Sequence, residues 1–169
     1  MFKEVADIKT ADMLNLPVPN AHYQNVAVKP SDIQKELVES LGERAQKIRD
    51  GTVDPHEDNM LKITNDGRKL ALDQRLINEL LPENKNSKVN ACIKNILKIY
   101  HATVVEKSTQ LVFCDMSTPR NDAFNVYDEI RNKLLEEGIL ESENAYIHNA
   151  KTDVKKKELY TKDREGKVR

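Results

Sequence analysis

Residues 110–119 read Gln-Leu-Val-Phe-Cys-Asp-Met-Ser-Thr-Pro, and this stretch decides the fold class that the sequence predicts. Four consecutive apolar residues are followed by residues that favour turns. A short, continuous apolar run with such boundaries is typical of a strand buried on both faces of a parallel sheet. Ligands bind beyond the carboxyl ends of such strands. We therefore expect functional residues in the loop Asp115–Arg120.

Helical patterns flank this strand on both sides, over residues 89–100 and 125–137. A helix–strand–helix unit indicates the α/β class. Two shorter strands are expected at 23–28 and 145–148, the second parallel to the central strand through a right-handed crossover. The sequence therefore predicts a mostly parallel, short sheet flanked by helices.

Two further helices are expected in the first half of the chain. Ser31 and Gln34 form a capping box, after which apolar residues recur at helical spacing until Asp50-Gly51. A second helical stretch runs from Asp54-Pro55 to Leu72. Gly67 weakens its middle, so we expect a break near residues 65–67.

Length and composition limit the classes of protein that fit. The 169 residues suit one domain, and a net charge of -1 neither requires nor excludes a nucleic-acid partner. The sequence contains no signal peptide and no apolar run that could span a bilayer. Its two cysteines fit a reducing compartment, so a cytoplasmic location without membrane association is expected.

One spacing suggests an enzyme. Cys114 and Arg120 are separated by five residues, as in cysteine-dependent phosphatases, in which the thiolate attacks phosphorus and the arginine holds the phosphate oxygens. The intervening loop, however, contains no glycine, and Pro119 removes one backbone donor. The alternative is a buried cysteine that ends a core strand.

Two groups of residues suggest phosphate contacts instead. Ser117 and Thr118 offer hydroxyl groups after the central strand, although their spacing alone favours an ordinary turn that caps the next element. Lys151 and Thr152 follow the expected strand 145–148, at the start of a segment with eight basic and four acidic residues. Thr152 is suited to cap a helix whose N-terminus faces an anion; the alternative is a solvated lysine face.

Several familiar site types have no signature in the sequence. The histidines lack a second ligand at useful spacing, so no metal site is expected. Neither the Walker A pattern nor the Gly-x-Gly-x-x-Gly pattern occurs. The chain alone therefore has no recognisable nucleotide cradle.

The order of several segments resembles the second RecA-like (P-loop-type) lobe of Swi/Snf-type superfamily-two helicases and translocases. The similar segments in the first half are a linker and edge strand (14–28), a helix start with the family's "serine-x-x-glutamine" pattern (31–34) and a leucine-rich helix (58–64). They are followed by a lysine-containing helix start (87–89) and by two motifs at strand ends (110–118 and 146–152). The amino-acid sequence of residues 58–73 is similar to that found in large helicase/DNA-methylase proteins of bacterial mobile elements.

The resemblance implies a role and a division of the chain. Residues 1–30 would form the linker and edge strand, and 31–169 a truncated helicase C-terminal domain. The chain would then be an inactive fragment of an ATP-dependent motor, contacting the backbone of double-stranded DNA through Ser117, Thr118, Lys151 and Thr152. The first motor lobe, ATP and Mg²⁺ would belong to the parent protein. Asn149-Ala150 replaces the family's usual glycine. A pure interaction module remains a third possibility beside the motor and the phosphatase.

Overall fold

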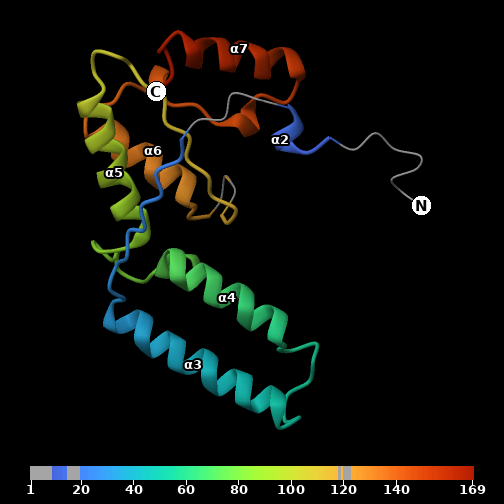
Figure 1. Ribbon diagram of the computed structural model, residues 1–169. Helices are drawn as coiled ribbons and strands as arrows, with labels where there is room; N and C mark the ends of the chain where they lie inside the picture. Colours follow the sequence, from blue (N-terminus) through green and yellow to red (C-terminus); the bar gives the residue numbers. More distant parts are fainter. Residues whose placement is uncertain (1–8, 15–19, 118, 120–122) are drawn as a thin grey trace.

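Figure 1 shows the computed structural model, in which residues 9–14, 20–117, 119 and 123–169 are described. Over these residues the chain is helical. The six α-helices are α2 (Ala11–Leu14), α3 (Asp32–Arg49), α4 (Met60–Leu72), α5 (Lys88–Ala102), α6 (Val126–Glu136) and α7 (Asp153–Arg164). Single turns of 3-10 helix lie at Gln74–Leu76, Glu141–Glu143 and Ile147–Asn149.

The predicted α/β class, a partial RecA-like lobe with a mostly parallel sheet, is wrong. The described residues contain no strand, and the third expected strand overlaps the 3-10 turn at 147–149. Leu111 and Phe113, expected in the centre of the sheet, are largely exposed. An apolar run becomes a buried strand only where partner strands cover it, and the described part of the chain supplies none.

Helices α3 and α4 form a hairpin, seen at the bottom of Figure 1. The predicted capping box is confirmed, because Ser31 accepts from the Gln34 N–H and the Gln34 side chain accepts from the Ser31 N–H. The expected break in the second helix is wrong, since α4 is continuous through Gly67. A Cβ atom at that position would lie 3.7 Å from the Leu41 side chain, which is an ordinary van der Waals contact, so the packing of α3 on α4 does not require a glycine there.

A second helix pair, α5 and α6, carries the main apolar core. Both helices were predicted from their apolar spacing, and this prediction is confirmed. Gly138 adopts a left-handed φ of 87° just after α6, as expected of a C-terminal cap. The core cluster consists of six buried side chains: Val89, Ile93, Ile96, Val126, Leu134 and Ile139.

Buried polar groups hold the hairpin together and join it to the second helix pair. The Gln34 amide donates to the Leu70 carbonyl, and the Ser31 hydroxyl donates to Gln74. Asp73, which is 0% exposed, accepts two side-chain hydrogen bonds from Arg75. Arg75 also donates to Glu129 on α6 at 3.0 Å. The two helix pairs are therefore connected through hydrogen-bonded charges rather than through apolar contact alone.

The last residue closes the end of α5. Arg169 donates to the carbonyls of Tyr100 and Thr103 and stacks on the Tyr100 ring at 4.1 Å. Its backbone N–H donates to the Glu143 carbonyl. Cations are favoured at a helix C-terminus, where carbonyl groups lack partners within the helix.

The buried pair predicts a large effect of one substitution. Replacing Asp73 with Asn removes a charge that Arg75 needs in a site without solvent, and we expect the free energy of unfolding to fall by about 3 kcal/mol. Urea denaturation measures this. The control is Asp32→Asn, which also breaks a salt bridge, to Lys35, but at a side chain that is 91% exposed. Similar losses in both variants would contradict the assigned role of Asp73.

Candidate nucleic-acid interface

Helix α7 is the most exposed long helix of the described chain and contains no buried residue. Thr152 caps it as predicted, its hydroxyl accepting from the Lys155 N–H at 3.3 Å. Asp153 in the first turn and Lys162 in the last have the charges that the helix dipole favours. Leu159 is half-buried and is one of its few inward contacts. Most of the helix surface is therefore free to meet a partner.

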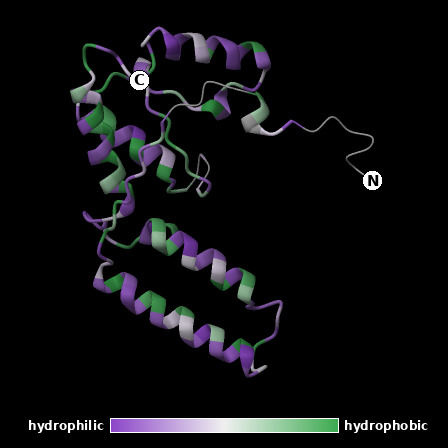
Figure 2. Cartoon of the chain, in the orientation of Figure 1, coloured by the Kyte–Doolittle hydropathy of each residue, from purple (hydrophilic) through white to green (hydrophobic). Residues whose placement is uncertain are grey.

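The positive charge of this helix is mostly uncompensated. In the described part of the chain, two lysines of the segment 151–169 have an acidic neighbour: Lys156 beside Asp153 at 3.8 Å and Lys167 beside Glu165 at 2.6 Å. The other lysines of the segment form no ion pair with a residue that the structure describes; they are Lys151, Lys155, Lys157 and Lys162. The mostly hydrophilic colouring of α7 is visible in Figure 2.

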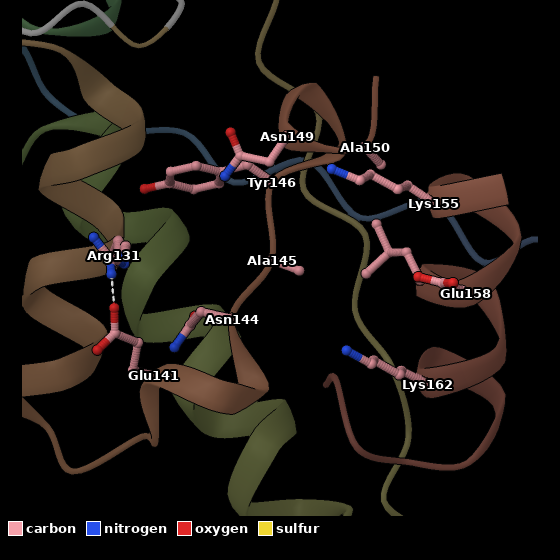
Figure 3. Close-up of a pocket in the computed structure, with 11 residues that line it drawn as sticks. Arg131, Glu141, Asn144, Ala145, Tyr146, Asn149, Ala150, Lys155, Glu158 and Lys162 are labelled. Carbon is pink, nitrogen blue, oxygen red and sulfur yellow. Dashed lines mark hydrogen bonds and ion pairs between the residues drawn. The ribbon is translucent and has the colours of Figure 1, made fainter. Parts of the chain in front are cut away.

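A cleft of about 490 Å³ lies between α7 and residues 141–150. In Figure 3, Lys155 and Lys162 extend from α7 toward the opposite wall, on which Asn144 and Tyr146 lie. Arg131 of α6 also lines the cleft but is paired with Glu141. The cleft therefore contains two ammonium groups that form no ion pair with a described residue and the Asn144 amide, all of which can donate to anionic oxygens, together with the carboxylates Glu141 and Glu158.

Tyr146 is fixed in this wall. Its hydroxyl donates to the Tyr127 carbonyl at 2.9 Å and contacts Asp128 at 3.3 Å, and the two tyrosine rings meet edge to face. Burial, reinforced by the negative charge of Asp128, raises the pKa of Tyr146 to about 12. The phenol therefore stays neutral at physiological pH and acts as a structural support.

The predicted nucleic-acid contacts are divided between two elements. Ser117 lies at the start of α6, where its hydroxyl accepts the Val126 N–H at 2.9 Å, and its backbone has a left-handed φ of 63°. Thr118 lies outside the described residues. Lys151 and Thr152 begin α7. Ser117 thus has a local structural role, whereas Lys151 belongs to the exposed basic surface.

The loop of the alternative phosphatase site is partly described. Cys114 is half-buried; its thiol donates to the Met116 carbonyl at 3.0 Å, and its carbonyl accepts from the Tyr127 hydroxyl. Arg120 lies outside the described residues. The phosphatase reaction stays a prediction. It requires turnover of an aryl phosphate that disappears in Cys114→Ser.

Sequence reasoning missed two features of the region. Lys162 belongs to the cleft, and its seven-residue spacing from Lys155, close to two helical turns, was the available signal. The salt bridge between Arg68 of α4 and Asp115 could not be predicted from a local sequence pattern, because 47 residues separate the two partners. No group of three or more His, Cys, Asp or Glu side chains suited to a metal ion occurs in the described ranges.

Comparisons with protein families, with curated proteins and with solved structures give no match to this chain. Among the helices that the structure describes, none is both long and apolar enough to cross a membrane.

The raised pKa of Tyr146 predicts a loss of stability in alkali. Between about pH 10 and pH 12 the unfolded phenol ionises while the folded phenol does not, so the free energy of unfolding falls as the pH rises. Tyr146→Phe removes this contribution, and its stability should fall less between pH 8 and pH 11 than that of the wild type. Urea denaturation at both pH values measures the difference. Tyr23→Phe, at an almost wholly exposed side chain, should keep the wild-type dependence.

Proposed function

We propose that this chain is a non-catalytic part of an ATP-driven DNA helicase or translocase, and that Lys151 and α7 contact the DNA phosphate backbone. The observation that carries the DNA contact is the set of unpaired lysines on an exposed helix. The order of motifs in the sequence supports the link to a motor. The sheet-based lobe that those motifs suggested is not part of the proposal.

The positions of the lysines favour an extended anionic partner. On a helix with 3.6 residues per turn, Lys155 and Lys162 lie on one side, about 10 Å apart along the axis. Lys151 directly precedes the N-cap Thr152. Glu158 lies between them and reduces the local potential. Double-stranded DNA presents one negative charge per ~1.7 Å of its axis, so such a row meets phosphates at any rotational setting.

The contact is expected to be independent of DNA sequence. Lysines are flexible point charges that neutralise phosphates, whereas base recognition requires side chains with fixed pairs of donors or acceptors in a groove. Four of the ten exposed residues of α7 are lysines, and Arg164 is the one other exposed cation of the helix. Backbone contact without base recognition is what a motor needs to move along any sequence. In this proposal, ATP and Mg²⁺ are bound by the parent motor and its first lobe.

DNA affinity tests the contact. The triple variant Lys151→Gln, Lys155→Gln, Lys162→Gln should bind a 30-base-pair duplex at least about tenfold more weakly than the wild type, and the slope of log affinity against log salt should decrease by about one per lysine. Fluorescence anisotropy across a salt series measures both quantities.

A matched control distinguishes the effect of removing lysines from α7 from the effect of lowering the net positive charge anywhere on the protein. Lys47→Gln, Lys94→Gln, Lys98→Gln removes the same charge from exposed lysines on α3 and α5 that form no ion pair in the described structure. Equal weakening in both triple variants would mean that α7 is not the contact surface. Absence of binding at low salt would contradict the DNA proposal and favour a pure interaction module.

A further inference from the structure

The segment Gln110–Cys114 exposes one apolar face to solvent. Leu111 and Phe113 are 73% and 90% exposed, whereas Val112 between them is 45% exposed. The residues at both ends of the segment are half-buried. All three of these residues are exposed, but the exposed fraction falls at Val112 and rises again at Phe113, a period of two that is typical of a strand with one face toward the protein.

The inner face is held by specific contacts with α5 and α6. The side-chain amide of Gln110 donates to the Ile96 carbonyl at 3.1 Å. The Tyr127 hydroxyl donates to the Cys114 carbonyl at 2.6 Å. Cys114 also packs against the core cluster. The segment is therefore positioned by the fold, although no strand pairs with it in the described part of the chain.

The outer edge of this segment offers free backbone groups. In a strand, the N–H and C=O groups of successive residues point to opposite edges. Because the Cys114 carbonyl is directed at Tyr127, the backbone groups of Leu111 and Phe113 belong to the other edge. Neither of these two residues forms a backbone hydrogen bond to another described residue. A free edge of this kind is a template for an additional strand.

We propose that a second copy of this chain pairs antiparallel with this edge, with Val112 on the two-fold axis. Leu111 then lies opposite the partner subunit's Phe113, and the two residues exchange both of their backbone hydrogen bonds. The outer faces of both strands bring aliphatic and aromatic side chains together. Half-buried Gln110 lies opposite the partner's half-buried Cys114 on the inner face. This register therefore places half-buried residues opposite each other, as it does the exposed residues Leu111 and Phe113.

The charges around the segment favour a copy of itself as the occupant. A two-fold interface must be self-complementary. Residues 108–114 carry no charge; Lys107 precedes them and Asp115 follows. Antiparallel pairing brings the Asp115 end of one strand to the Lys107 end of the other. Lys107 is exposed and forms no ion pair with a described residue. The Asp115 carboxylate is paired with Arg68 at 2.5 Å, but its side chain is 80% exposed and can accept from a second cation. Unlike charges therefore meet at both ends.

Sedimentation equilibrium of the chain tests this pairing. A single short strand is a small interface, so the average mass should rise from one chain toward two between about 10 µM and 1 mM. Phe113→Lys should raise the dissociation constant at least about tenfold. Leu80→Lys, at an equally exposed leucine outside the segment, should leave it unchanged. A monomer at all concentrations, unchanged association of Phe113→Lys, or equal loss in both variants would overturn the proposal.

Two proline variants test the edge itself. Leu111→Pro removes an N–H that the pairing uses, whereas Val112→Pro removes one that strand geometry assigns to the opposite edge. We expect the first to weaken association at least about tenfold and the second to weaken it much less, with unchanged helix content by circular dichroism in both. Equal effects, or a larger effect of Val112→Pro, would overturn the assigned edge and register.

Discussion

The connection between the two helix pairs depends on one buried ionic group. Asp73 has no exposed surface, and Arg75 satisfies it while also reaching Glu129 on α6. Arg75 stacks on the Phe124 ring at 4.2 Å, which excludes water from the pair. A buried charge is tolerated only when its partners are fixed. The orientation of the hairpin relative to α5 and α6 is therefore determined by hydrogen-bond geometry, which is more directional than apolar packing.

The helices were predictable because their signals are local. Ser31, Ser87 and Thr152 each accept a backbone N–H three residues ahead, so these three N-termini are set by single side chains. The apolar periods of α5 and α6 identified the core-facing sides of these helices. Continuity through Gly67 was not predicted, because a glycine lowers helix stability by about 1 kcal/mol and the packing of α4 on α3, which is not visible in the local sequence, offsets this cost.

The sheet was predicted incorrectly because an apolar run does not specify what covers it. Leu111, Val112 and Phe113 have the composition of a buried strand, but burial requires partner strands from elsewhere in the chain. Part of the candidate site was predictable, because the roles of Thr152 and Lys151 follow from local patterns in the sequence. The cleft between α7 and residues 141–150 depends on how distant segments pack, and so does the local role of the Ser117 hydroxyl.

The contacts of Arg169 have a mechanical consequence. Helix α7 is connected to the rest of the chain through residues 141–152 at its start and through the turn that leads to Arg169 at its end. Because Arg169 is bonded to the carbonyls of Tyr100 and Thr103, tension applied to α7 is transmitted to the end of α5 as well as along the chain toward α6. A pull on this basic helix is thus shared by two anchors. Local detachment of α7 requires both the Arg169 contacts and those of the 141–152 segment to break.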